Sequence, residues 1–115
     1  MMNRRILFLS DVNSAHTRKW AESLAKKGFE IGIFSLSPCK SDWFEVFSNI
    51  HVFSSVKLTP EQFLASDISK VAYFKELKAL KDIIKTFKPD IVHAHYATSY
   101  GLLGVLTKFK PLIIS

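Results

Sequence analysis

Residues 5–36, RILFLSDVNSAHTRKWAESLAKKGFEIGIFSL, contain the pattern that decides the fold. Their first six residues are a short apolar run bounded by polar residues, which is typical of a buried strand. A helix is expected next, capped by Asn13 or Ser14 and ended by Gly28, because glycine readily takes the left-handed conformation found at helix ends. The apolar run after Gly28 predicts a second strand. A strand, a helix and a strand within about thirty residues predict a right-handed crossover in a parallel sheet.

The rest of the chain continues this alternation. Residues 71–87 predict a long helix that Pro89 ends, since proline disfavours helix at the residue before it. The other expected elements are a short helix around Trp43, a helix at 60–65, a helix at 99–108 and strands at 50–54, 90–95 and 112–115. Alternating strands and helices of this kind predict one doubly wound, Rossmann-like α/β domain over residues 1–115. Its parallel strand order is expected to be 3-2-1-4-5, and the sheet is expected to be incomplete at its carboxyl end.

Two helices have an apolar stripe. In the first, Trp20, Ala21 and Leu24 recur at helical spacing and are expected to face the core. In the long helix the stripe consists of Phe74, Leu77, Leu80, Ile83, Ile84 and Phe87. Lysines occupy the opposite side of that helix, at Lys75, Lys78, Lys81, Lys85 and Lys88. A lysine stripe is interpreted as a solvated helix face, and the alternative is a docking surface for an anionic membrane.

The composition and the net charge of the chain limit the classes of function that it can have. The chain of 115 residues is 48% hydrophobic, which is too apolar for a disordered protein. Its formal net charge of +6 favours an anionic partner. Nucleic-acid binding would rest on charge alone, so no nucleic-acid partner is predicted. Cys39 is the only cysteine and no apolar run approaches the length of a membrane-spanning helix. These features predict a cytoplasmic protein, soluble or peripheral at the inner face of the membrane.

Ligands of doubly wound sheets bind beyond the carboxyl ends of the strands, where the strand order reverses. That rule selects the segments 11–17 and 95–100. The first contains no glycine, although dinucleotide-binding loops and P-loops need glycines for close backbone approach to phosphate. The amino terminus of the following helix still favours an anion, so Asn13, Ser14 and His16 are candidate ligand contacts. The alternative is that Asn13 and Ser14 only cap the helix.

The second segment contains two histidines, His93 and His95, which point to the same face if they lie in a strand. A metal pair is not predicted, because no convincing third ligand is visible. His95 is nearer the end of the strand and is the candidate catalytic residue, acting as a hydrogen-bond donor or as a base. His93 is expected to lie deeper, as a hydrogen-bonded core residue.

Two parts of the chain resemble a known family. Residues 89–96, PDIVHAHY, followed by Gly101 and an apolar helix, resemble the fourth-strand motif of family 4 glycosyltransferases. Residues 16–30, HTRKWAESLAKKGFE, are similar to the start of the same domain. The resemblance implies the amino-terminal, acceptor-side domain of a truncated enzyme with the GT-B fold. In that family a second domain, absent from this chain, binds the nucleotide-sugar donor, and transfer needs no metal. No cofactor is therefore expected.

The resemblance also implies roles for single residues. His95 matches the family histidine near the transferring sugar, and the loop with Asn13, Ser14 and His16 lies beside the diphosphate or the acceptor. Many members have glycines in that loop, whereas this sequence has none. The substrate-binding set is completed by Tyr96, Thr98 and Ser99.

The implied full-length enzyme transfers a sugar to a glycan or lipid-linked acceptor, in the synthesis of a cell-surface polysaccharide. The isolated chain is expected to be inactive. The alternative is a standalone, non-catalytic Rossmann-like domain that binds a ligand or a nucleotide. A receiver-type signalling domain is not predicted, because it needs an aspartate after the third strand and none follows residues 50–54.

Two apolar features of the sequence are relevant to membrane binding and to self-association. Trp43, Phe44 and Phe47 are interpreted as core residues, and insertion into a membrane is the alternative. The last expected strand, 112–115, would be an exposed apolar edge that pairs with another chain. Self-association through this edge is expected, and a strictly monomeric species in sedimentation at high concentration would contradict it.

Overall fold

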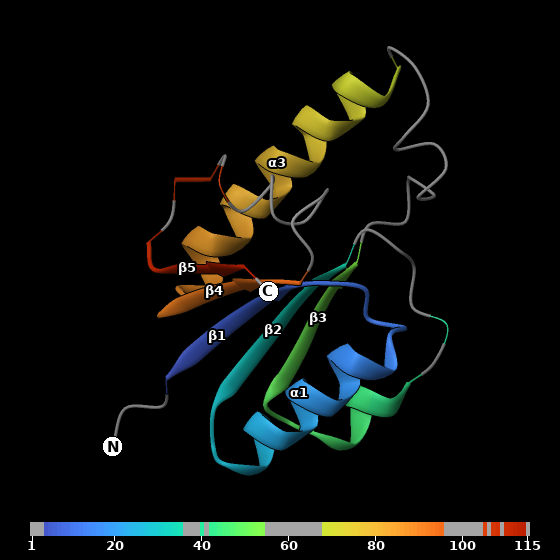
Figure 1. Ribbon diagram of the computed structural model, residues 1–115, viewed down its shortest axis with the longest axis vertical. Coiled ribbons are helices and arrows are strands. Elements are labelled where there is room, and N and C mark those ends of the chain that lie inside the picture. Colours follow the sequence, from blue (N-terminus) through green and yellow to red (C-terminus); the bar gives the residue numbers. More distant parts are fainter. Residues whose placement is uncertain are drawn as a thin grey trace.

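The computed structural model describes residues 4–35, 40, 42–54, 68–95, 105, 107–108 and 110–114 (Figure 1). In these residues the elements follow in the order β1 Arg5–Leu9, α1 Ala15–Lys26, β2 Glu30–Ser35, the 3₁₀ helix η1 Trp43–Val46, β3 Ile50–Ser54, α3 Ile68–Phe87, β4 Ile91–Ala94 and β5 Leu112–Ile114. The helix expected at 60–65 lies outside the described residues, as do most residues of the helix expected at 99–108.

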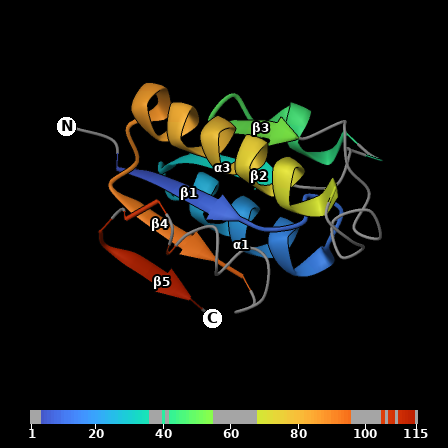
Figure 2. The same cartoon turned by 90° about the horizontal axis from the view of Figure 1, so that it is seen from above.

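The five strands form one parallel sheet with the order β3-β2-β1-β4-β5, which confirms the predicted fold class and strand order. Helix α1 covers one face of the sheet and α3 covers the other (Figure 2). The strand order reverses between β1 and β4, whose carboxyl ends lie side by side with Leu9 opposite Ala94.

Side chains that alternate along the strands build two separate cores, because successive residues of a strand point to opposite faces. In β1, Leu7 and Leu9 pack toward α3, whereas Ile6 and Phe8 pack toward α1. Gly32 in β2 leaves room on the α3 side, since a Cβ atom there would meet Leu7 Cδ1 at 3.0 Å and the Phe87 ring at 3.2 Å.

Helix α1 has the expected ends but not the expected buried stripe. Ser14 is the N-cap, and its Oγ accepts a hydrogen bond from the His16 backbone N–H at 3.2 Å. Gly28 follows the helix with φ of +95°, as a left-handed end position requires. The buried residues of the helix are Thr17, Ala21 and Ala25.

The prediction that Trp20 faces the core is wrong, because its side chain is 43% exposed. Residues 17, 21 and 25 repeat every four positions and are small, so α1 approaches the sheet closely along them. Trp20 lies on the flank of that stripe, where its ring contacts His93 of β4 at a centroid distance of 6.1 Å.

Helix α3 begins at Ile68, earlier than the expected residue 71. It ends at Phe87, after which Lys88 takes a left-handed conformation with φ of 54°. Arg5 Nη1 donates to the carbonyl of Phe87 at 2.8 Å, which places a cation at the negative end of the helix. Leu77, Leu80 and Phe87 are buried, while all five lysines of the predicted stripe are exposed.

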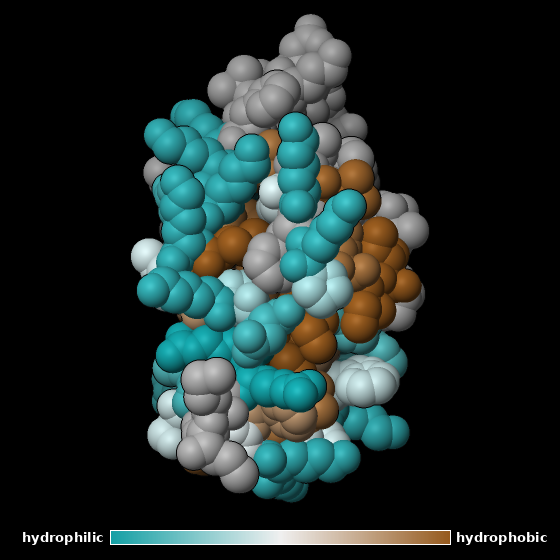
Figure 3. All heavy atoms as spheres, turned by 90° about the vertical axis from the view of Figure 1, so that its left-hand side faces the viewer, coloured by the Kyte–Doolittle hydropathy of each residue, from teal (hydrophilic) through white to brown (hydrophobic). Residues whose placement is uncertain are grey.

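Trp43 in η1 is a core residue, as predicted: it is 9% exposed and its Nε1 donates to the Val12 carbonyl at 3.1 Å. Phe44 and Phe47 pack against the same core as partly buried residues. Strand β5 lies at the sheet edge, where Ile113 and Ile114 are 48% and 42% exposed. On this side of the molecule, hydrophobic surface is open between hydrophilic side chains (Figure 3). Among the described residues, no helix is long and apolar enough to cross a membrane.

Candidate functional site

The carboxyl ends of β1 and β4 bring the two predicted segments together. The backbone N–H of His95 donates to the Leu9 carbonyl at 3.0 Å, which continues the pairing of these strands one residue beyond β4. Helix α1 begins a few residues after the end of β1 and runs back along the face of the sheet that it covers (Figure 1). The loop after β1, the first turn of α1 and the end of β4 therefore meet at the point where the strand order reverses.

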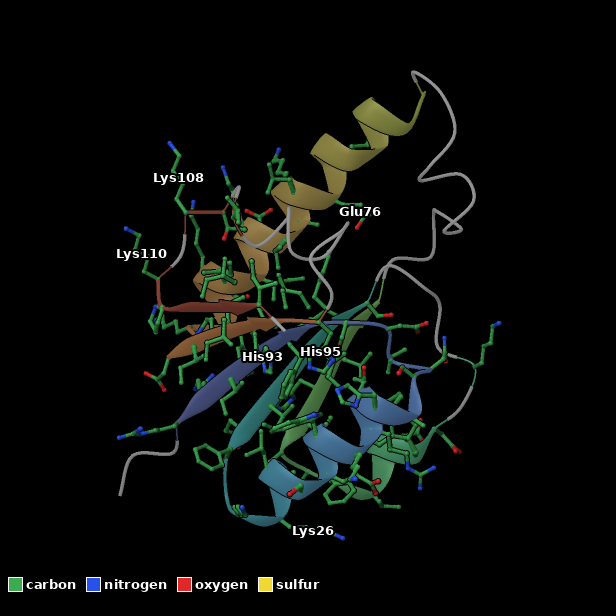
Figure 4. All side chains as sticks on the ribbon, in the orientation of Figure 1. Lys26, Glu76, His93, His95, Lys108 and Lys110 are labelled. Atoms are coloured by element: carbon green, nitrogen blue, oxygen red, sulfur yellow. The ribbon has the colours of Figure 1, made fainter. Side chains whose placement is uncertain are left out.

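Three histidines converge there. The ring centroids of His93 and His95 lie 4.8 Å apart, which confirms that both residues point to one face of the sheet. His16, on the first turn of α1, stacks against His95 with a centroid distance of 5.3 Å. Phe8 in β1 contacts both strand histidines, at 5.4 Å from His93 and 5.3 Å from His95. Figure 4 shows His93 and His95 at the end of β4, beside α1.

The expected depths of the two strand histidines are reversed. His95 is only 2% exposed, whereas His93 is half-buried. The cause is the return of α1 across the strand ends: His16 covers His95, and His93 faces the flank of the helix, where Trp20 lies at a centroid distance of 6.1 Å. His95 is thus a buried imidazole in contact with an exposed histidine, His16, and a half-buried one, His93.

Burial keeps these imidazoles uncharged near neutral pH. Burial first, and then repulsion from the nearby His93 and His16, lower the pKa of His95 from 6.5 to about 4. Burial, followed by repulsion from His16, also lowers the pKa of His93. A neutral imidazole has one N–H donor and one acceptor nitrogen, so His95 can donate to a substrate hydroxyl or accept its proton.

The loop after β1 is held by its own polar side chains. The Asp11 carboxylate accepts from the Asn13 backbone N–H at 2.9 Å, and the Asn13 side-chain oxygen accepts from the Lys40 backbone N–H at 2.8 Å. Ser14 is the helix cap, whereas the Asn13 side chain connects the loop to Lys40. Of the three loop residues predicted for the site, His16 is the one whose ring contacts the buried histidine.

Sequence reasoning missed two residues of this site. Trp20 packs edge-on against His16 at 6.3 Å and against His93 at 6.1 Å. The signal was the spacing of four residues from His16, which puts two helical side chains on the same side. Ser10, at the end of β1, is 1% exposed and lies beside His95 in the continued register. A serine that ends an apolar run was interpreted only as a strand boundary.

The other predicted contacts, Tyr96, Thr98 and Ser99, lie outside the described residues. Within the described part of the chain, no three His, Cys, Asp or Glu side chains form a group that could hold a metal ion. The histidine rings contact one another by stacking and edge contacts.

A hollow on the solvent side of α1 lies apart from the histidines. Four of its seven lining residues are basic: Arg18, Lys19, Lys26 and Lys27. Arg18 is already paired with Glu22 at 2.9 Å. No histidine lines this hollow, so it is a basic surface feature rather than part of the histidine site.

Comparisons with known proteins agree with this architecture. Acinetobacter baumannii MurG superposes with a TM-score of 0.65 at 16% identity, over 96% of this chain and 33% of MurG. The C-terminal domain of a hydrogenase from Pyrococcus furiosus superposes with a TM-score of 0.64 at 11% identity, over 100% of this chain and 92% of that domain. At these identities the likeness shows the shared fold. The chain spans about a third of the length of MurG.

No curated protein matches the sequence. A family model does: the model described as "Glycosyl transferase 4-like" matches residues 5–115. That range contains the strand-helix-strand unit, the glycine-free loop and the histidine-bearing strand end on which the resemblance rests. The chain belongs to the glycosyl transferase 4-like family.

Proposed function

We propose that residues 1–115 form the acceptor-side domain of a GT-B glycosyltransferase, which transfers a sugar from a nucleotide-sugar to a glycan or lipid-linked acceptor. The observation that carries the proposal is the buried His95 at the switch point of a chain that belongs to this family. A neutral, enclosed imidazole suits a site that hydrogen-bonds a sugar hydroxyl, because hydrogen bonds are stronger where water is excluded.

The proposal assigns separate tasks to the residues around His95. His95 contacts the reacting sugar as donor or base, and His16 covers it from the first turn of α1. Tyr96, Thr98 and Ser99 follow His95 directly in the chain and would contact the acceptor or the sugar. The donor diphosphate is bound by a second domain, so the isolated chain is inactive. That this chain spans only a third of MurG supports the need for a further domain.

The charged and apolar surfaces suit a cytoplasmic enzyme that works at the inner face of a membrane, in the synthesis of a cell-surface polysaccharide. The exposed lysines of α3 would face anionic lipid. The exposed edge of β5, with Ile113 and Ile114, remains the predicted surface for self-association.

A standalone binding domain is the second candidate. The same fold occurs in a domain of a hydrogenase, 92% of which this chain covers, so the fold is not confined to glycosyltransferases. Such a domain would bind its ligand fully by itself, whereas an acceptor-side domain would bind a nucleotide-sugar weakly without its partner domain.

Titration of the ¹⁵N-labelled protein with UDP-glucose and GDP-mannose distinguishes the two. The proposal predicts a Kd weaker than about 1 mM, with signal changes at the carboxyl ends of β1 and β4, including His16 and His95. Signals of His51, an exposed histidine of β3, serve as the internal control and should stay unchanged. Saturable binding in the micromolar range would instead support the standalone domain. Changes confined to the lysines of α3 would contradict both candidates.

A further inference from the structure

The two tryptophans of the chain lie in different surroundings. Trp43 is 9% exposed and its Nε1 donates to the Val12 carbonyl at 3.1 Å, so it is a core residue. Trp20 is 43% exposed, and neither of the two cores includes it. An indole has one of the largest apolar surfaces of any side chain, so a ligand that covers Trp20 removes much apolar surface from water.

Trp20 lies in a group of rings at the point where the strand order reverses. Its ring contacts His16 at a centroid distance of 6.3 Å and His93 at 6.1 Å. His93 and His16 each contact His95 in turn, at 4.8 Å and 5.3 Å. These four rings therefore form a closed ring cluster, which consists of His16, Trp20, His93 and His95.

The ring cluster has an enclosed side and an open side. Phe8, which is fully buried, contacts both strand histidines, and His95 is 2% exposed. His16 and Trp20 are exposed, and His93 is half-buried. A ligand that approaches from solvent therefore meets Trp20 and His16 first.

The indole of Trp20 is held in place before a ligand binds. Its two ring neighbours come from different elements, His16 from α1 and His93 from β4, and the interplanar angles are 73° and 81°. Contacts with two elements restrict the orientation of the side chain, so binding costs less conformational entropy than it would for a freely rotating one. Trp20 is therefore a preorganised apolar surface beside imidazole rings.

These surroundings favour a carbohydrate as the ligand. A pyranose ring has an apolar face of C–H groups, which an indole can cover, and hydroxyl groups at its edge, which imidazole nitrogens can hydrogen-bond. A hydrocarbon chain would cover the imidazoles without hydrogen-bonding them, which is costly. A phosphate would need a cation, whereas burial, followed by repulsion from His16, lowers the pKa of His93 and keeps it uncharged near neutral pH.

We propose that Trp20 forms a carbohydrate subsite next to His95: its indole stacks against a pyranose ring of the acceptor, and the neighbouring imidazoles hydrogen-bond the hydroxyl groups of that ring. His93 contacts both Trp20 and His95, so the subsite lies one ring away from the position where the sugar reacts. The identity of this sugar as the acceptor rests on the proposed function, whereas carbohydrate binding at Trp20 does not.

Titration of the ¹⁵N-labelled chain with the methyl glycosides of glucose, galactose, mannose and N-acetylglucosamine tests the subsite. The measured quantity is the ¹H–¹⁵N signal of each indole N–H, which the two tryptophans give separately. At least one glycoside is expected to shift the Trp20 signal saturably, with a Kd of about 1–10 mM, as for other ligands of this size. The Trp43 signal should stay in place, because that indole is buried and bonded to the backbone.

Variants of Trp20 identify the ring as the cause. Trp20→Ala is expected to weaken binding of that glycoside at least about tenfold, measured by the shifts of the His93 ring, whereas Trp20→Phe keeps an aromatic face and should lose less than about fivefold. Both variants should stay folded, because Trp20 lies outside the two cores. Val46→Ala is the matched control: it removes another exposed apolar side chain, 83% exposed in η1, and should leave the Kd unchanged.

Three outcomes would overturn the proposal: no glycoside shifts the Trp20 signal, Val46→Ala weakens binding as much as Trp20→Ala, or the Trp20 signal responds to a short-chain phosphatidylcholine and to none of the glycosides. The last outcome would assign the ring to a lipid chain. Saturable glycoside binding at Trp20 in a protein that transfers no sugar would leave this inference standing while the proposed function fails.

Discussion

Acidification from pH 7 to pH 4 is expected to lower the free energy of unfolding by about 3 kcal/mol through His95 alone. The pKa of His95 is about 4 in the folded protein, against an ordinary value of 6.5. The unfolded chain therefore takes up a proton near pH 6.5, while the folded protein resists protonation until about pH 4. The stability that this histidine contributes is fully present above pH 6.5 and is lost as the pH falls from 6.5 to about 4. The pKa of His93 is also lowered, so protonation of His93 adds to the loss of folding stability as the pH falls.

Urea unfolding at pH 7, 5.5 and 4 measures this loss, and His95→Gln isolates its source. Glutamine does not titrate, so the variant should lose about 3 kcal/mol less than the unaltered protein between pH 7 and pH 4. His93 and His16, which face His95 and lower its pKa, are present in both proteins, so the difference measures the titration of His95 together with its coupling to these two rings. His51→Gln, which removes an exposed histidine outside the histidine site, is the control variant. An identical pH dependence in His95→Gln would show that His95 is not held neutral by burial.

Most of the fold was predictable because the strands are short apolar runs between strong stop signals. Gly28 and Pro89 each mark the end of a helix at the place where the structure ends it. The start of α3 at Ile68 was missed by three residues, although Ile68, Val71 and Ala72 already stand at helical spacing. The orientation of α1 was also missed. Hydrophobicity alone predicts that Trp20 is buried in preference to Thr17. A helix that lies close to a sheet, however, needs small residues at the contact, and Thr17 is only 1% exposed.

The location of the site was predictable from the sequence, whereas the arrangement of its side chains was less predictable. The rule that ligands bind at the carboxyl ends of parallel strands selected His16 and His95, whose rings are in contact. The burial of His95 depends on how α1 returns over the end of β4, which is a tertiary feature that spacing along the chain does not encode. Ser10 was missed for the same reason. Its place beside His95 follows from the register between two strands that are about eighty residues apart in the sequence.

The central claim is that His95 serves sugar transfer rather than the core alone. Sugar transfer by His95→Ala, in a chain that carries both this domain and a donor-binding domain, tests it most directly. General acid–base and hydrogen-bonding groups at such a position contribute about 10²- to 10⁴-fold to the rate. We expect kcat to fall at least about 100-fold, while urea unfolding shows a folded protein whose stability falls by less than about 3 kcal/mol.

His51→Ala is the control, because His51 is an exposed histidine of β3 that pairs with Glu30 at 2.9 Å, away from the histidine site. Its kcat is expected to stay within about twofold of the unaltered enzyme, as for surface substitutions in general. The predicted result is a large loss of kcat in His95→Ala alone, with the protein still folded. A turnover that falls only in proportion to the unfolded fraction, or that does not fall at all, would contradict the account and assign His95 to the core.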